Sequence, residues 1–291
     1  MNGQVIDIGG AGKHFALMHP YALSGRETSH PLDMRGWTTS NMSLLVEDDH
    51  ALLVGTGYSV HQEALLAQLE TLVGDRSLAI AIPRAEFSAM CNARPIADRF
   101  QVDMAYLRIP SPPRVFLNFR PQFPDDETDG LRDVPFELIE RGHRLAVDLA
   151  GTRVLEVLSP ELRLLPNSWG YDAATKTLLS SDIFTWVLRD TAAGPWLIDS
   201  DDPDTTTPAQ IEHALAHNRY WWLPGADMDD IRASLAELFD THDIETVVPD
   251  NGPLLRGAAI QRQYQLLDDY LVQAATQPAI GVAAADWRAT A

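Results

Sequence analysis

Two charged residues, Arg84 and Glu86, follow directly after the apolar run Ser77–Ile82. In an extended loop, side chains two positions apart project the same way, so this guanidinium and this carboxylate would share one face. An arginine offers a planar fork of N–H donors that matches a carboxylate. A carboxylate can serve as a general base, and an arginine can stabilise an anion. The pair is therefore a candidate for ligand binding or acid–base chemistry.

Two more polar residues stand near predicted strands later in the chain. Asp182 follows Leu178-Leu-Ser-Ser, and Asn251 follows Val247-Val-Pro-Asp. Serine hydroxyls at Ser88 and at the pair Ser180-Ser181 could act as nucleophiles, although no histidine lies close to them in the sequence to activate them.

Histidines offer a second possible site. His213 and His217 are four residues apart, so on a helix they would share one face at a spacing that suits metal ligands. No glutamate lies between them, unlike the zinc-protease arrangement. His14, His19 and His30 lie in an N-terminal segment that could fold over a pocket mouth. Either set could form a metal site, or could be surface and packing residues.

The elements that must position these residues follow from hydrophobic periodicity. Residues 1–36 are rich in Gly, Pro and His and are predicted to be irregular. Asn41–Val54 predicts a β-hairpin, and Ser77–Ile82 a strand covered on both faces. Spaced apolar residues predict four helices, at His61–Val73, Gln210–Trp222, Met228–His242 and Gln261–Ala274. Strands and helices arranged in two halves predict an α/β fold with sheets packed face to face and helices outside.

Composition limits the possible partners. The chain has 291 residues, 45% of them hydrophobic, and a formal charge of −19. So much negative charge disfavours binding to nucleic acid or to an anionic membrane surface. No apolar run is long enough to span a membrane, and no signal peptide is evident at the N-terminus. A single cysteine, Cys91, excludes an intrachain disulfide, which fits a cytoplasmic protein.

Four segments, in order, resemble landmarks of the metallo-β-lactamase superfamily, and of its flavodiiron branch in particular. They are the hairpin with Gly55-Thr-Gly57, the loop Ile82–Ala89, the stretch Leu164–Phe184 and Val247–Gly252. The third is the most specific, because Leu164-Leu-Pro-Asn-Ser-Trp169 and Leu178-Leu-Ser-Ser-Asp-Ile-Phe184 are similar to the flavodiiron His-Trp-Pro-Asp-Ser-Met and Leu-Phe-Ser-Asn-Asp-Ala-Phe. The resemblance implies a metallo-β-lactamase-type αββα sandwich.

The resemblance also implies that most ligands of the family's dinuclear metal site are replaced. Its glutamate and bridging aspartate are retained as Glu86 and Asp182. Its other ligand positions hold Arg84, Ser88, Ala89, Leu164 and Asn251. Arginine stays protonated, and leucine and alanine have no lone pair to donate. The remaining oxygens are too few for tight zinc or iron binding, which leaves no metal or, alternatively, a single weakly bound divalent ion such as Mg²⁺ or Ca²⁺.

Buried carboxylates that lose their metals need another cation, because an unpaired buried charge is costly. We hypothesise that the guanidinium of Arg84 substitutes for the metals; the alternative is that Arg84 points to solvent. Four tryptophans could line an apolar pocket at this place or could simply be core and rim residues. They are Trp169, Trp186, Trp221 and Trp222.

The sequence therefore predicts residues 37–275 as one metallo-β-lactamase-like domain and 276–291 as a flexible tail. The favoured function is that of a pseudoenzyme, a metal-free scaffold that binds a small molecule or a protein partner. The alternative is an enzyme with a rebuilt pocket that uses Arg84, Glu86, Asp182 and Asn251. The resemblance implies no bound flavin, since no room is left for a flavodoxin module, and it makes a homodimer reasonable.

Overall fold

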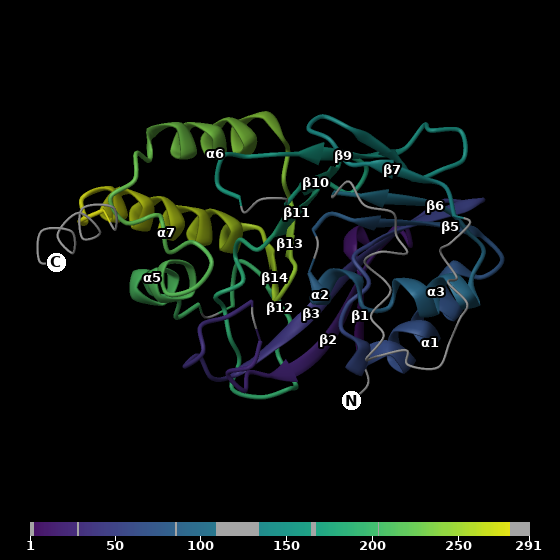
Figure 1. The fold of residues 1–291 in the computed structure, drawn as a ribbon, viewed down its shortest axis with the longest axis horizontal. Coiled ribbons are helices and arrows are strands. Elements are labelled where there is room, and N and C mark those ends of the chain that lie inside the picture. Colours follow the sequence, from purple (N-terminus) through teal and green to yellow (C-terminus); the bar gives the residue numbers. More distant parts are fainter. Residues whose placement is uncertain are drawn as a thin grey trace, which may run out of the picture.

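Two β-sheets pack face to face, with helices on both outer sides (Figure 1). The computed structural model describes residues 3–27, 29–84, 86–108, 134–163, 167–202 and 204–279. Figure 1 shows α1 and α3 on one side of the strands and α5, α6 and α7 on the other. This is the αββα arrangement that the sequence predicts. The helices are α1 (Gln62–Val73), α2 (Phe87–Met90), α3 (Ala93–Arg99), α5 (Pro208–Ala216), α6 (Asp229–Thr241) and α7 (Ala258–Ala275).

The first sheet is built from the N-terminal half of the chain, and its strands follow the order of the sequence. They are β1 (Gln4–Asp7), β2 (His14–Ala22), β3 (Trp37–Val46), β4 (His50–Val54), β5 (Ser77–Ile82), β6 (Val102–Leu107) and β7 (Phe136–Leu138). The predicted hairpin is confirmed as β3 and β4, which pair antiparallel with Val46 opposite Ala51. From β4 onward the pairing is parallel, with α1 as the first crossover. Short 3₁₀ turns (Ile8–Gly10 and Ser59–His61) precede β2 and α1.

The second sheet is built from the C-terminal half and mixes parallel and antiparallel pairs. In spatial order its strands are β12 (Leu197–Ile198), β14 (Leu254–Arg256), β13 (Thr246–Pro249), β11 (Thr177–Ser181), β10 (Trp169–Asp172), β9 (Val154–Leu158) and β8 (Arg144–Ala146). β11 and β13 run parallel, so their carboxyl ends lie at the same edge of the sheet. That edge carries the polar residues singled out from the sequence.

The core has three layers, which explains why the strands are apolar on both faces. On β3, Leu44 packs into the outer cluster with α1 and α3, whereas its neighbour Leu45 packs into the cluster between the sheets. Leu53 and Leu52 on β4 divide in the same way. Alternate side chains of a strand point to opposite faces, so a strand covered on both sides reads as a continuous apolar run. The second sheet packs its outer face against α5, α6 and α7.

The N-terminal segment is not irregular throughout, and the prediction for residues 1–36 is wrong in this respect. β1 and β2 extend the first sheet, and β2 pairs with β3 over nine positions from His14–Leu45 to Ala22–Trp37. Met18 of β2 is fully buried between the sheets. The apolar run in β2 is short and lies between histidines and a proline. This local composition does not indicate a strand. Pairing with the long β3 and burial of one face outweigh that local composition.

Four of the described helices, α1, α5, α6 and α7, lie in predicted segments, whereas α2 and α3 were not predicted. α5 begins at a capping box formed by Thr207 and Gln210. It ends at Ala216, six residues before the end of the predicted helix, and residues 217–222 form turns instead. Most of the predicted flexible tail, residues 280–291, lies outside the described residues. None of the helices in the described ranges is both long and apolar enough to cross a membrane.

Candidate functional site

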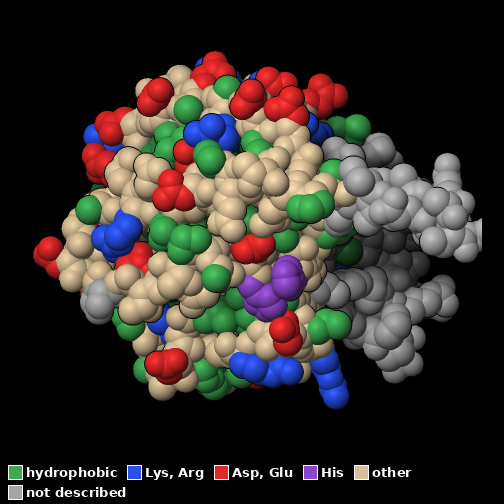
Figure 2. Space-filling view, turned by 90° about the vertical axis from the view of Figure 1, so that its left-hand side faces the viewer, with side chains coloured by type: hydrophobic (Ala, Val, Ile, Leu, Met, Phe, Trp, Pro, Cys, Tyr) green, Lys and Arg blue, Asp and Glu red, His purple; other side chains and the backbone are tan. Residues whose placement is uncertain are grey.

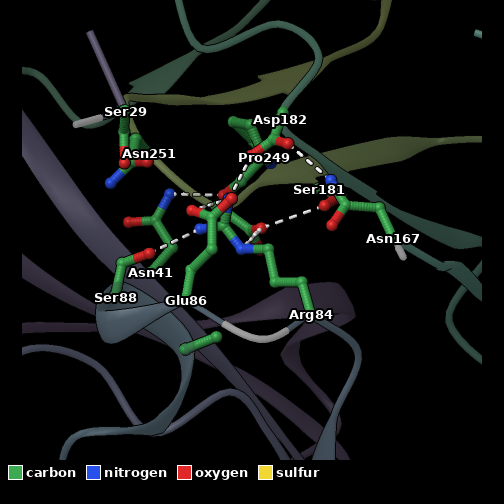
Figure 3. Close-up of polar contacts among 12 residues, drawn as sticks. Ser29, Asn41, Arg84, Glu86, Ser88, Asn167, Ser181, Asp182, Pro249 and Asn251 are labelled. Atoms are coloured by element: carbon green, nitrogen blue, oxygen red, sulfur yellow. Dashed lines mark hydrogen bonds and ion pairs between the residues drawn. The ribbon is translucent and has the colours of Figure 1, made fainter. Parts of the chain in front are cut away.

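Three loops meet where the carboxyl ends of β5, β11 and β13 approach the start of β3. The loop after β5 carries Arg84 and Glu86, and the turn after β11 carries Asp182. The backbone joins the two sheets here, because Asn41 N donates to Asp250 O at 2.9 Å and Asp250 N donates to Ser181 O at 2.9 Å. Figure 3 shows the side chains of these loops pointing toward one another. Residues far apart in the sequence thus form one polar cluster.

Arg84 lies at the centre of this cluster and is only 1% exposed. Its Nη1 donates to Asp182 Oδ1 and lies 3.3 Å from Glu86 Oε2. Its Nη2 donates to Ser88 Oγ at 2.8 Å. Its Nε lies 2.8 Å from Asp250 Oδ2, a charge contact whose angle is too poor for a hydrogen bond. The guanidinium does not point to solvent; it joins three carboxylates.

A second guanidinium, from Arg219, joins the cluster. Its Nη1 donates to Glu86 Oε1 at 2.6 Å and to Asp182 Oδ1 at 3.3 Å. Its Nη2 donates to Ser29 Oγ at 3.4 Å. Arg219 lies in the turns that follow α5, so the early end of that helix is what places it here. Sequence analysis missed Arg219 because its partner Glu86 is 133 positions away and no local pattern signals the contact.

Asp182 is held in one orientation by its neighbours. Asn167 Nδ2 donates to Asp182 Oδ2 at 2.5 Å, and Thr185 Oγ1 donates to the Asp182 backbone carbonyl at 3.0 Å. The turn itself is unusual, since Ser181 (φ 52°) and Phe184 (φ 68°) both adopt left-handed backbone. Non-glycine residues in this region cost about 1–3 kcal/mol each and persist only where the surroundings fix them. The fold therefore holds the Asp182 carboxylate in place at a cost in conformational free energy.

Asp250 is the second residue of the cluster that was not predicted from the sequence. The family resemblance singles out its neighbour Asn251 as a ligand position. Ser181 Oγ donates to Asp250 Oδ2 at 3.2 Å. Burial raises the pKa of Asp250; Arg84 counteracts this, while the negative charges of Asp182 and Glu86 raise the pKa further. The carboxyl group of Asp250 therefore binds a proton more readily than an ordinary aspartate.

Arg84 remains a cation in this environment. Burial alone would lower the pKa of its guanidinium, but the charges of Asp250, Asp182 and Glu86 outweigh burial and raise that pKa above its ordinary value. Two guanidinium groups and three carboxylates then give a formal charge of −1. Neither guanidinium can take up a proton, so any proton transfer in the cluster would involve a carboxylate.

Asn251 lies beside the cluster but takes no part in its ion pairs. Its Nδ2 donates to Tyr21 Oη and to Thr39 O, both at 3.1 Å. The amide thus ties the end of β13 to β2 and β3. His30 is buried nearby, and burial, followed by the positive charge of Arg219, lowers its pKa to about 4. His30 is therefore neutral at physiological pH.

The other predicted candidates are placed elsewhere or lack a partner for chemistry. His14 forms a buried network with Asp172 and Thr175, and His19 bonds Gln68. At the surface, His213 of α5 and His217, which directly follows α5, approach to 3.2 Å between their Nδ1 atoms. Acidic side chains are spread over this side of the molecule, with histidine among them (Figure 2). Across the described ranges, no group of three or more His, Cys, Asp or Glu residues is arranged to hold a metal ion.

The serines and tryptophans are likewise accounted for. Ser88 accepts a hydrogen bond from Arg84, which cannot act as its base, and Ser180 donates to the Ile183 carbonyl. Trp169 and Trp186 are buried, while Trp221 is 55% exposed. Of these tryptophans, Trp169 borders a cavity of about 30 Å³ between the sheets. The four do not form one pocket.

Comparison with known proteins places the fold. No protein-family model and no curated protein sequence matches the chain. Among solved structures, the chain is similar to the Flv1 flavodiiron core from Synechocystis sp. PCC6803 (TM-score 0.62, 15% identity), with 93% of this chain and 61% of that one covered. It therefore spans less than two thirds of that protein.

This chain covers two further solved structures almost completely. A fragment, residues 1–254, of a putative diflavin flavoprotein A 5 from Nostoc sp. PCC 7120 matches with TM-score 0.63 and 16% identity, covering 94% of this chain and 96% of the fragment. A metallo-β-lactamase from Pontibacter korlensis matches with TM-score 0.54 and 14% identity, covering 92% and 99%. The chain has the metallo-β-lactamase fold, in its flavodiiron-like form.

The dinuclear metal centre implied by this fold does not fit the residues present. By the resemblance to flavodiiron proteins, four positions that would hold metal ligands are occupied by Arg84, Ser88, Ala89 and Asn251. A fifth such position, Leu164, lies outside the described residues. The two carboxylates that match, Glu86 and Asp182, are already bonded to guanidinium groups. A metal ion there would have to displace two cationic side chains from the cluster.

Proposed function

We propose that this chain is a metal-independent binding protein of the metallo-β-lactamase fold, a pseudoenzyme in which paired arginines take over the electrostatic role of the metals. The observation that supports it is the buried guanidinium of Arg84, which contacts Asp182, Glu86 and Asp250 at once. A buried charge is tolerated when it is paired and hydrogen-bonded. The residues thus supply what two divalent ions would otherwise supply, which is positive charge between carboxylates.

The chemistry of the family's catalysis gives a second argument. Hydrolysis in this fold uses metal-activated water, and an arginine cannot lower the pKa of a water by coordinating it. The fork of a guanidinium can orient a carboxylate, but it cannot hold an open coordination position. A site built from Arg84 and Arg219 is therefore suited to recognition.

In the alternative function, an enzyme with a rebuilt pocket, Arg84 would have to bind an anionic group of the substrate. The contacts of Arg84 argue against this role. Its N–H donors are directed at Asp182 and Ser88, and its remaining charge contacts are carboxylates. An incoming anion would meet a cluster with a formal charge of −1. Arg84 is better placed to hold the cluster together than to bind substrate.

Metal content tests the proposal. The protein would be produced in medium supplemented with iron, zinc and manganese, desalted, and measured by elemental analysis alongside its thermal unfolding with and without a chelator. We expect far less than one metal ion per chain and no shift of the unfolding midpoint on chelation. Two tightly bound ions per chain would refute metal independence.

A further inference from the structure

The two arginines of the cluster differ in how firmly they are enclosed. The side chain of Arg84 is 1% exposed and comes from a loop directly after a buried strand. The side chain of Arg219 is 15% exposed and comes from the turns between α5 and α6. Its Nη1 donates to Glu86 Oε1 and to Asp182 Oδ1. Arg84 is therefore the fixed cation, and Arg219 is the one whose place can be taken by another molecule.

The charge of the cluster indicates what would bind there. With Arg219 in place, three carboxylates face two guanidinium groups, and Glu86 and Asp250 each keep side chains that are 25% exposed. Within the described chain, the buried Oε2 of Glu86 has no hydrogen-bond donor. If Arg219 moved away, the formal charge of Arg84 and the carboxylates would become −2. The site therefore favours a cation and repels an anion.

Two buried polar groups beside the cluster also lack hydrogen-bond partners among the described residues, and this observation does not depend on the charges of the cluster. Asn41 and Ser168 line the inter-sheet cavity of about 30 Å³ together with Asp250 and Ser181. Asn41 is 6% exposed, its Nδ2 is bonded to backbone carbonyls, and its Oδ1 accepts no hydrogen bond from the described residues. The Oγ of Ser168, also buried, has no hydrogen-bond partner among the described residues either. The amide oxygen requires a donor, whereas the hydroxyl can donate or accept, and water or a ligand can supply both partners.

Two tyrosines lie close to Ser29. Tyr58 Oη lies 3.5 Å from Ser29 Oγ, and Tyr21 packs edge-on against Tyr58 with ring centroids 5.6 Å apart. Ser29 is also a partner of Arg219. The faces of aromatic rings attract cations, and carboxylates combined with aromatic rings are suited to ammonium and guanidinium groups.

We propose that the ligand of this site is a small organic cation with a guanidinium or primary ammonium group, which takes the place of the Arg219 side chain between Glu86 and Asp182. Arg219 is then an intramolecular occupant that fills the site in the free protein. This inference rests on the proposed metal-independent binding function. It adds the chemical class of the ligand and the residue that gives way to it.

Chemical rescue tests the inference. Arg219→Ala removes the occupant, and ethylguanidinium at millimolar concentration is the probe. We expect the lower thermal midpoint of Arg219→Ala to rise by several degrees with ethylguanidinium, because a ligand that binds the folded state stabilises it. Wild-type protein should bind the same probe about tenfold more weakly by calorimetry, since Arg219 competes for the site. If Arg219→Ala does not fold, Arg219→Gln provides the same test.

Three controls, namely ethylurea, Arg232→Ala and Mg²⁺ alone, make the outcome decisive. Ethylurea, a neutral molecule of the same shape, should not rescue Arg219→Ala. Arg232→Ala removes a guanidinium from the more exposed ion pair with Asp268 and should gain nothing from ethylguanidinium. Absence of rescue, equal rescue by ethylurea, or rescue by Mg²⁺ alone would overturn the inference. A metal-free protein without rescue refutes only the ligand class, whereas two metal ions per chain refute the proposed function itself.

Discussion

The contacts of Arg84 depend on the shape of its guanidinium as well as on its charge. Three of its nitrogen atoms face different partners, namely Asp182, Ser88 and Asp250. A lysine ammonium is a single point of charge on a flexible chain and cannot reach such divergent partners together. At this position, charge alone is therefore insufficient to hold the three loops in register.

Arg84→Lys should consequently destabilise the fold even though it conserves the charge. We expect a loss of about 1.5–3 kcal/mol, the range for hydrogen bonds to charged groups. Urea unfolding of the variant and of wild type would measure it. Equal stability of the two proteins would show that the fork of donors contributes nothing.

Asp250 offers a prediction about pH, because its pKa is raised in the folded protein above the ordinary value of 3.8. A carboxyl group that binds its proton more tightly when folded stabilises the fold below its ordinary pKa. That contribution is lost as the pH rises through the raised value. The free energy of unfolding of wild type, minus that of Asp250→Asn, should therefore fall as the pH is raised from 3.8 toward neutrality. A difference that grows with pH would contradict a raised pKa of Asp250 in the folded protein.

At the scale of elements, the sequence predicted those parts of the fold that local patterns specify. The hairpin of β3 and β4 and the helices α1, α6 and α7 have periodic apolar residues and were found. β2 was missed because its pairing with β3 is set by tertiary contacts. The same distinction explains why only part of the polar cluster was predicted from the sequence. Arg84, Glu86 and Asp182 follow recognisable segments, whereas Arg219 and Asp250 join them only through the folded chain.

The strand β2 contributes to the core, and this can be tested with a matched pair of variants. Met18 of β2 is fully buried between the sheets, whereas Val5 of β1 is 39% exposed. Met18→Ala should cost about 2–5 kcal/mol, as is usual when a large core side chain is truncated. Val5→Ala should stay within about 0.5 kcal/mol. Similar small losses in chemical denaturation would mean that the N-terminal segment is peripheral.

At the scale of the whole molecule, buried neutral histidines make the fold sensitive to acid. Burial, and then the neighbouring His61, lowers the pKa of His19 to about 4, as burial and Arg219 do for His30. Both are almost fully buried. The unfolded chain takes up protons at these histidines below their ordinary pKa of 6.5, while the folded chain resists until about pH 4. The stabilising effect is present above pH 6.5 and is lost as the pH falls toward 4.

We therefore expect the thermal midpoint to decline between pH 6.5 and pH 4, with each histidine contributing on the order of 3 kcal/mol across that window. Replacing one of them should flatten the decline. His30→Leu is the suitable variant, and a scan of midpoint against pH is the measurement. An identical slope in the variant would show that His30 is not held neutral by the fold.

If arginines take the electrostatic place of metal ions, Arg84 and Asp182 must be energetically coupled, and a double-mutant cycle on these two residues measures that coupling directly. Arg84→Met leaves carboxylates without their central cation and should cost about 3–5 kcal/mol of unfolding free energy. In the background of Asp182→Asn the same replacement should cost less, giving a coupling of about 1–3 kcal/mol. If the two losses simply add, the guanidinium does not neutralise this carboxylate, and the claim that arginines replace the metals is contradicted.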